Sequence, residues 1–338
     1  MKAALLLPLS GSSAAIGQPM VDAAQMALFD MAAEHFELMP RDTKGTPQGA
    51  AEAARRAIAD GATIILGPLY SGDVAAVRPV AQQAGVPVLA FTTDWTQAAN
   101  GVWVMGFIPA DQVVRVADYA RAQGVTRFGA LAPRGVYGDA VVNALQAAAQ
   151  RQGAQITQVE RYEPAVADFT GPVQKIAPAN SQAVLMAEGG QRIRSLAATA
   201  AANGLNPRQV KFLGTGLWDD PAVAQEPALA GAWFAAPDPN QRADFEGRFQ
   251  SLYGKKPPRL ATLSYDATAL AAVLARQGGA RPFDPATLTN PSGFAGIDGL
   301  FRLRTDGIAE RRLAVLEITP QGTRVVDPAP TNFDVLGQ

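Results

Sequence analysis

Short apolar runs alternate along the chain with longer segments in which apolar residues recur every three or four positions. A strand buried on both faces reads as a continuous apolar run, whereas an amphipathic helix gives the longer period. The first predicted strands are Ala3–Leu7, Phe36–Met39, Thr63–Leu66, Val86–Ala90 and Val102–Met105. The helices predicted between them are Pro19–Glu34, Gln48–Ala59 and Asp73–Ala84. This order is typical of βαβ units in a parallel sheet.

A second series of the same kind follows Phe107-Ile108-Pro109. Its predicted strands are Phe128–Ala132, Ile156–Val159, Ala183–Ala187, Val210–Leu213 and Trp233–Ala236. Its predicted helices are Gln112–Ala122, Ala140–Arg151, Val173–Ile176 and Ile193–Ala202, and the helices Arg242–Tyr253 and Leu263–Ala275 come after a Pro-Asp-Pro break. The segment Gly299–Thr319 then alternates apolar and polar residues around Asp306-Gly307, which predicts a β-hairpin.

These two series predict an α/β fold with two doubly wound parallel-sheet lobes joined by a multi-strand hinge. We expect the N-terminal lobe to contain residues 1–107 plus 237–298, and the C-terminal lobe residues 108–236 plus 299–338. Several crossings between the lobes would leave a cleft between them. Open α/β sheets bind ligands outside the carboxyl ends of their strands, so we expect a binding site at those ends.

Composition narrows the possible chemistry. Hydrophobic residues make up 48% of the 338 residues and charged residues 17%, which favours a large core over long disordered tails. The net charge of −1 and the lack of a basic block argue against a nucleic-acid partner. The chain has no cysteine and one histidine, His35, so a cysteine or histidine metal site and a Ser–His–acid triad are disfavoured. We therefore expect no metal, no cofactor and no enzymatic activity, with an α/β enzyme as the alternative from another class.

The N-terminus, "MKAALLLPLSGSSA", resembles a signal peptide in having a lysine followed by an apolar run. Because the run is short, ends at Pro8 and leads directly into a helical pattern, we interpret Ala3–Leu7 as the first buried strand. No segment is long and apolar enough to predict a membrane span, so we expect no membrane insertion of this chain.

Ser71 follows the predicted strand Thr63–Leu66 in "GPLYSGDVAAV" and precedes a helix. Its hydroxyl could cap that helix, or it could bind an anion or polar oxygen together with the free N–H groups of the first turn. A nucleophilic serine is disfavoured, because the motif is not G-x-S-x-G and the sequence places no base beside it.

Four further strand ends carry polar or aromatic residues. Thr92, Thr93 and Asp94 end the strand Val86–Ala90, and they are either loop and cap residues or a second wall of the same site. Tyr137 opens a helix in "GVYGD" and either packs locally or presents its ring and hydroxyl to the cleft. Glu188 in "MAEGGQ" is either a solvated turn carboxylate or a binding charge. Trp218 in "FLGTGLWDD" is either a core residue or a cover over a ligand, and the Gly-x-Gly there is a weak dinucleotide signal because Asp219 replaces the third glycine.

These strand-end motifs, in this order, resemble the type I periplasmic binding fold of the leucine/isoleucine/valine-binding protein family over essentially the whole chain. The segments that carry the resemblance are "LLLPLSGSSAAIGQ", "DGATIILGPLYS", "AGVPVLAF", Tyr137-Gly138 and "GFAGIDGLFRLRTDG". Four others, "LAFTTD", "GVWVMGFIPADQVVRVADYA", "LGTGLWDD" and "YDATALAA", resemble a subgroup described as penicillin-binding-protein activators, which is related to lipoproteins that stimulate peptidoglycan synthases.

The resemblance implies roles for several residues. Amino-acid-binding members hold the ligand carboxylate with a serine like Ser71 and a threonine in the next strand-end loop, and a tyrosine like Tyr137 contacts the ligand from the second lobe. The threonine position falls on Asp94, or on Thr93 after a shift of one residue. The acid that would hold the ammonium falls near Gly216, which leaves Glu188 as a substitute. These departures predict weak binding of free leucine, isoleucine and valine.

We therefore expect an exported, non-enzymatic protein that closes two lobes around a small polar, amino-acid-like ligand. It would be the substrate-binding component of an ABC-type uptake system or a related receptor; the alternative is a periplasmic activator of penicillin-binding proteins. The expected ligand contacts are Tyr70, Ser71, Thr92, Thr93, Asp94, Tyr137, Glu188 and Trp218. The expected protein partner is an ABC transporter permease or a penicillin-binding protein. The expected location is the periplasm, with the signal peptide removed and a lipid anchor compatible with a longer precursor.

Overall fold

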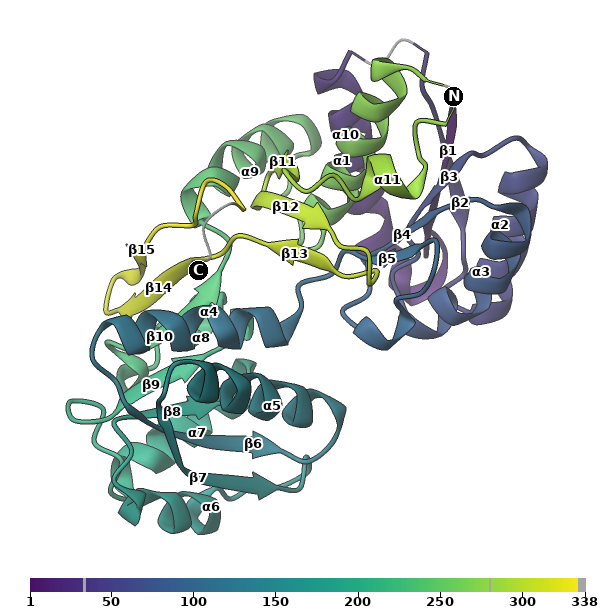
Figure 1. Cartoon of the computed structure of the whole chain (residues 1–338). Helices are drawn as coiled ribbons and strands as arrows, with labels where there is room; N and C mark the ends of the chain where they lie inside the picture. Colours follow the sequence, from purple (N-terminus) through teal and green to yellow (C-terminus); the bar gives the residue numbers. More distant parts are fainter. Residues whose placement is uncertain (33–34, 280, 334–338) are drawn as a thin grey trace. The chain divides into compact units, whose positions relative to one another are not determined.

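The computed structural model describes residues 1–32, 35–279 and 281–333, in which the chain forms two compact α/β units (Figure 1). Unit 1 contains Met1–Phe107 and Pro239–Arg312, together with the described residues after Pro330. Unit 2 contains Ile108–Asp238 and Leu313–Pro330. The predicted class, an α/β fold with parallel sheets in two lobes, is confirmed.

The sheet of unit 1 is parallel and has the strand order β2-β1-β3-β4-β5. Its strands are β1 (Lys2–Leu7), β2 (Glu37–Asp42), β3 (Ile64–Leu66), β4 (Val88–Ala90) and β5 (Val102–Val104). The helices of this unit are α1 (Ala14–Asp30), α2 (Pro47–Ala59), α3 (Ser71–Ala84), α9 (Pro239–Tyr253), α10 (Ala261–Gln277) and α11 (Pro285–Leu288).

Helices cover both faces of this sheet, which explains why its strands read as continuous apolar runs. Ala3, Leu5 and Leu7 of β1 lie in one buried cluster with residues of α1 and α10. Ala4 and Leu6 point to the opposite face and lie in a cluster with α2 and α3. Successive side chains of a strand alternate between faces, so a strand between two helical layers can hold no polar residue on either side.

The sheet of unit 2 has the strand order β15-β14-β10-β9-β8-β6-β7, in which β6 to β10 are parallel and the β14–β15 hairpin adds antiparallel strands at the edge. Its strands are β6 (Arg127–Pro133), β7 (Gln155–Tyr162), β8 (Ala183–Met186), β9 (Lys211–Gly214), β10 (Trp233–Ala236), β14 (Ala314–Thr319) and β15 (Gly322–Asp327). Its helices are α4 (Pro109–Ala122), α5 (Val136–Arg151), α6 (Thr170–Ile176), α7 (Gly190–Ala202) and α8 (Pro221–Ala224). The helices α4 and α5 pack on one face, and α6 and α7 pack on the other.

The predicted assignment of residues 299–338 to the C-terminal lobe is wrong for residues 299–312 and for the described residues after Pro330, which lie in unit 1. Residues 237–238, predicted in the N-terminal lobe, lie in unit 2. The hairpin around Asp306-Gly307 forms as predicted, between β12 (Gly299–Leu303) and β13 (Ala309–Arg311). However, β12 also pairs with β11 (Phe294–Gly296), and Phe301 and Leu303 lie in the same buried cluster as Leu5 of unit 1. After the segment Ile108–Asp238, the chain returns to unit 2 only at Leu313, and β14 then pairs with β10. The predicted boundary after Phe107 agrees with the structure.

A buried cluster of charged residues in unit 1 lies beside two points where the chain leaves this unit, after Phe107 and after Arg312. The Arg311 guanidinium donates from Nη2 to the Met105 carbonyl (3.0 Å) and lies over the Phe107 ring, 5.0 Å from its centroid. Asp266 of α10 lies 3.8 Å from Arg311 Nη1 and accepts the Ile297 N–H at 2.7 Å. Both charged side chains are almost completely buried. Burial, reinforced by the nearby Asp298 charge, raises the pKa of Asp266 to about 7. A buried charge without its partner is costly, so this pair constrains the local backbone.

We expect Arg311→Met to lower the free energy of unfolding by about 3 kcal/mol at pH 8, because it leaves the Asp266 carboxylate buried without its cation. The measurement is urea denaturation followed by circular dichroism. The control is Arg56→Met on α2, which removes an exposed pair with Glu52 (3.8 Å) and should change stability by less than about 0.5 kcal/mol. Equal midpoints for the two variants would contradict the assigned role of Arg311.

Candidate functional site

The carboxyl ends of β3 and β4 bring several predicted site residues together in unit 1. Gly67 follows β3 with φ = +88°, and a Cβ there would lie 2.4 Å from the Leu6 carbonyl oxygen, so only glycine fits this turn. The chain then passes through Tyr70, which is half-buried, into α3 at Ser71. Asp94 lies in the loop after β4. Because β3 and β4 are parallel neighbours, this loop and the start of α3 lie at the same edge of the sheet.

Ser71 does not cap its helix. The N-cap position of α3 is Tyr70, and Ser71 is the first helical residue. Its hydroxyl Oγ instead donates to Asp94 Oδ2. The chain's one histidine, His35, accepts the Met1 N–H at its carbonyl, beside the start of β1 and therefore at the opposite edge of the sheet. The arrangement gives Ser71 no imidazole base, so it offers no nucleophilic mechanism of the serine-hydrolase kind.

Asp94 is fixed by its hydrogen bonds. Its Oδ1 accepts the Thr96 backbone N–H (3.1 Å) and hydroxyl (2.6 Å), and its Oδ2 accepts the Gln97 amide at 3.2 Å in addition to Ser71. Partial burial raises the pKa of Asp94, but the hydrogen bonds from Ser71, Thr96 and Gln97 outweigh that effect and hold it below its ordinary value. Asp94 is therefore ionised at neutral pH.

The other predicted residues of this loop differ in exposure. Thr92 is buried, and its hydroxyl accepts the Asp94 backbone N–H at 3.1 Å, so it shapes the turn. Thr93 is exposed. Sequence reasoning missed Thr96 and Gln97, although both follow Asp94 in the same strand-end loop. Their amide and hydroxyl groups are the signal that would have indicated a polar cluster here.

Two more loops reach the same edge. A Cβ on Gly45, in the loop after β2, would lie 3.5 Å from Ser13 Oγ and 3.7 Å from Tyr70 Cε2. The loops after β1, β2 and β3 therefore meet beside Tyr70. Ser13 was also missed, because the Gly/Ser run after β1 looks like any loop until its neighbours in space are known.

Unit 2 places Tyr137 at the carboxyl end of β6, in the first turn of α5. Its hydroxyl pairs with Thr215 Oγ1 at 3.1 Å, and Thr215 follows β9. Burial raises the pKa of Tyr137 to about 12, so the phenol is protonated at neutral pH. Contact of Tyr137 and Ser71 with the same ligand stays a prediction.

Glu188 is neither a solvated turn residue nor an open binding charge, and both of its predicted interpretations are corrected. Its side chain is buried and paired with Arg192, which donates to Oε2 from Nε (3.0 Å) and to Oε1 from Nη2 (2.9 Å). The Tyr162 hydroxyl also donates to Oε1 at 3.0 Å. The carboxylate is neutralised within unit 2, so it cannot supply an unpaired charge for a ligand ammonium.

The prediction that Trp218 covers a ligand is wrong. Its side chain is 0% exposed and donates from Nε1 to the Glu188 carbonyl at 2.9 Å. A Cβ on Gly214 would lie 2.1 Å from Trp218 Cδ2, so the indole packs where that glycine leaves room. Gln112 of α4, also missed, accepts the Gly216 N–H at 2.8 Å and holds this loop against α4.

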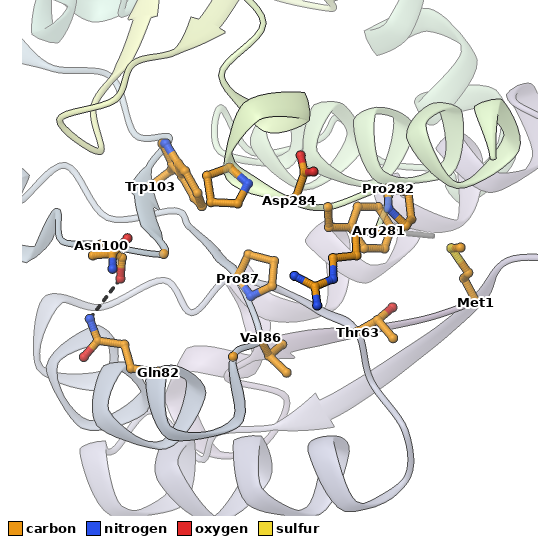
Figure 2. Close-up of a pocket in the computed structure, with 14 residues that line it drawn as sticks. Met1, Thr63, Gln82, Val86, Pro87, Asn100, Trp103, Arg281, Pro282 and Asp284 are labelled. Carbon is orange, nitrogen blue, oxygen red and sulfur yellow. Dashed lines mark hydrogen bonds between the residues drawn. The ribbon is translucent and has the colours of Figure 1, made fainter. Parts of the chain in front are cut away.

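A cavity of about 670 Å³ lies at the other edge of the unit 1 sheet (Figure 2). Thr63, Pro87 and Gly101 line it, and each precedes a strand, so the cavity opens at the amino ends of the strands rather than beside Ser71. Figure 2 shows the Arg281 side chain extending between Pro87 and Thr63. This cavity is separate from the strand-end cluster.

No group of three or more acidic, histidine or cysteine side chains among the described residues is arranged to hold a metal ion. Among the helices in residues 1–32, 35–279 and 281–333, none has the length and hydropathy to cross a bilayer.

Comparison with known proteins identifies the family. Residues 1–323 match the family model described as periplasmic binding protein, and the chain belongs to that family. A curated relative, an uncharacterized protein of Rickettsia prowazekii (strain Madrid E), is 25% identical over 160 residues, which are 47% of this chain and 43% of that protein. The chain thus matches less than half the length of this relative.

Solved structures share the fold. A putative branched-chain amino acid ABC transporter from Rhodospirillum rubrum has a TM-score of 0.86 at 19% identity, covering 96% of this chain and 99% of that one. The substrate binding protein LivJ of Streptococcus pneumoniae in complex with isoleucine has a TM-score of 0.68 at 17% identity, covering 97% and 99%. A solute binding protein of R. palustris in complex with benzoate has a TM-score of 0.67 at 18% identity, covering 99% and 98%. At these identities the likeness is one of fold.

Asp73 supplies a pH-dependent prediction for the same edge. It lies in the first turn of α3 and is 1% exposed, and its Oδ2 makes no hydrogen bond with a described residue. Burial raises its pKa to about 6, and a hydrogen bond with Thr43 only partly opposes the shift. An unfolded aspartate titrates near 3.9, so the folded state binds this proton more tightly, and stability falls as pH rises through about 6.

We therefore expect Asp73→Asn to raise the Tm relative to the wild type at pH 7.5 and to leave it nearly unchanged at pH 4. The measurement is differential scanning fluorimetry across this range. Asp244→Asn, at an exposed position of α9, is the control and should give no pH-dependent gain. A gain at pH 4 equal to that at pH 7.5 would contradict a buried charge at Asp73.

Proposed function

We propose that this protein is the solute-binding component of an ABC-type uptake system, or a related receptor, and that it acts in the periplasm. The observation that carries the proposal is the family match over residues 1–323, combined with polar clusters at the strand ends of both units. The family consists of binding proteins. The Ser71 hydroxyl donates to the Asp94 carboxylate, and hydrogen-bonding groups of this kind at strand ends support a binding site.

The proposed mechanism is closure of the two units around a small solute, with water excluded as they meet. Tyr70, Ser71, Thr93 and Asp94 would contact the solute from unit 1, with Thr92 shaping their loop. Tyr137 would contact it from unit 2 through a protonated hydroxyl beside Thr215. Glu188 and Trp218 would not contact it, because both are occupied within unit 2.

The partner implied by this function is an ABC transporter permease. The solved structures with this fold include transport proteins that hold isoleucine or benzoate, which supports a small solute of that size range. The alternative prediction, an activator of penicillin-binding proteins, has no support in these comparisons and is not proposed.

The experiment is a thermal-shift screen of the purified protein against amino acids, amino-acid amides, aromatic acids, amines and polyols. A true solute at about 100 times its Kd stabilises the folded state by about 2.7 kcal/mol, which gives a saturable rise in Tm. Tyr137→Ala should weaken the Kd of that solute by at least about tenfold, which corresponds to about 1.4 kcal/mol. The control Arg56→Met should leave the Kd unchanged.

Two results would contradict the proposal. One is a screen in which no compound raises the Tm of the wild type. The other is a solute whose Kd is the same for the wild type, Tyr137→Ala and Ser71→Ala, because binding would then take place away from the strand ends.

A further inference from the structure

The hydroxyl at the carboxyl end of β3 already has a carboxylate bound to it, and that carboxylate belongs to the chain. Ser71 Oγ donates its hydrogen to Asp94 Oδ2. A hydroxyl has one hydrogen to donate. While this contact holds, Ser71 cannot donate the same hydrogen to the carboxylate of a solute.

Hydrogen bonds to both of its carboxylate oxygens hold the Asp94 side chain against Ser71. Ser71, Thr96 and Gln97 together give it donors on both oxygens, and the Thr96 contacts of 3.1 and 2.6 Å come from its own loop. Removing the carboxylate from Ser71 would break a charge-assisted hydrogen bond and disturb the others. The side chain is only half-buried, so its charge still acts on a solute bound at this edge.

Gln97 gives a second, independent indication. Its Nε2 donates to Asp94, while its Oε1 is buried without a hydrogen-bond donor among the described residues. A buried acceptor without a donor costs free energy, and most such groups in native proteins are paired. An N–H or O–H group can satisfy this oxygen, whereas a second carboxylate would add one more acceptor to the Asp94 loop.

The charged residues at the neighbouring strand ends also disfavour an anionic solute. Asp42 ends β2 and accepts the backbone N–H groups of Leu9 and Lys44, each at 2.8 Å. Asp73 lies two residues after Ser71. Lys44 is the basic residue of the loop after β2. Three carboxylates and one ammonium make this edge unfavourable for an anion.

We propose that Asp94, held by Ser71, determines specificity: the solute presents a cationic or hydrogen-bond-donating group, rather than a carboxylate, to this edge of unit 1. The inference rests on the proposed function and deepens it by naming the chemical class of solute. It separates this protein from the similar folds that hold isoleucine or benzoate, both of which carry a carboxylate. A primary amine, which has several N–H donors and a positive charge, suits the site best.

The test uses matched pairs of probes that differ in the carboxylate. The pairs are leucine and leucinamide, benzoate and benzylamine, and 4-hydroxybenzoate and 4-hydroxybenzylamine. Binding of each to the wild-type protein is measured by thermal shift and by isothermal titration at pH 7.5. We expect the amide or amine of a pair to bind at least about tenfold more tightly than its carboxylate. This measurement needs no variant, so it does not depend on whether a substitution is tolerated.

The variant Asp94→Asn keeps the size of the side chain and removes its charge. We expect it to shift the preference within a pair toward the carboxylate by at least about tenfold, because repulsion of the anion and attraction of the amine are both lost. Ser71→Ala, which leaves the Asp94 charge in place, should keep the preference for the amine. Asp244→Asn, at an exposed position of α9, is the control and should leave both affinities unchanged.

The outcomes separate this inference from the proposed function. Tighter binding of the carboxylates by the wild type, or a preference that Asp94→Asn leaves unchanged, overturns the inference while leaving a solute-binding protein. If no probe and no compound of the broader screen shifts the Tm of either protein, the proposed function fails and the inference fails with it. Circular dichroism of each variant establishes that it is folded before its binding is compared.

Discussion

Burial of parallel strands on both faces is the constraint from which the other features of this protein follow. Because α1 and α10 cover one face of the unit 1 sheet and α2 and α3 cover the other, residues such as Leu5 and Leu6 must both be apolar. Along a strand such as β1, polar side chains are then confined to the ends. Beyond the strand ends, the loops and first helical turns carry Ser71 and Asp94 in unit 1, and Tyr137 and Thr215 in unit 2. The position of the candidate site is thus a consequence of how the core is built.

The polar groups at the carboxyl ends of the strands form hydrogen bonds and ion pairs with one another, and the two units differ in which partners they use. In unit 2 the Glu188 carboxylate is matched by the Arg192 guanidinium, and the Tyr137 hydroxyl is matched by that of Thr215, so little charge remains. In unit 1 the partners of Asp94 are two hydroxyls, an amide and a backbone N–H, all of them neutral, so its charge persists. Neutral donors stabilise a carboxylate without cancelling its field, which is why the preference of the site is assigned to unit 1.

One buried ion pair of unit 1 holds the backbone in place near the points where the chain passes between the units. Arg311 and Asp266 are almost completely buried, and Arg311 contacts the carbonyl of Met105 and the ring of Phe107, just before the chain leaves unit 1. Placing two ions in a core is expensive compared with apolar packing. Their effect here is to fix the backbone on the unit 1 side of the crossings after Phe107 and after Arg312.

The sequence by itself determined the α/β class, the order of the strands from β1 to β10 with the long helices between them, the boundary after Phe107 and the hairpin at Asp306-Gly307. Each of these depends on local periodicity or turn chemistry, which a single segment carries. It also placed Ser71 and Asp94 at neighbouring strand ends. The pairing of Glu188 with Arg192 could have been suspected from their i,i+4 spacing, but not its burial.

Only the tertiary structure decided that residues 299–312 pack in unit 1, that Trp218 fills the space beside Gly214, and that Ser71 binds Asp94 instead of capping its helix. These outcomes depend on which distant residues come into contact, and a strand-end residue has the same local pattern whether its neighbours in space cover it, pair with it or leave it open.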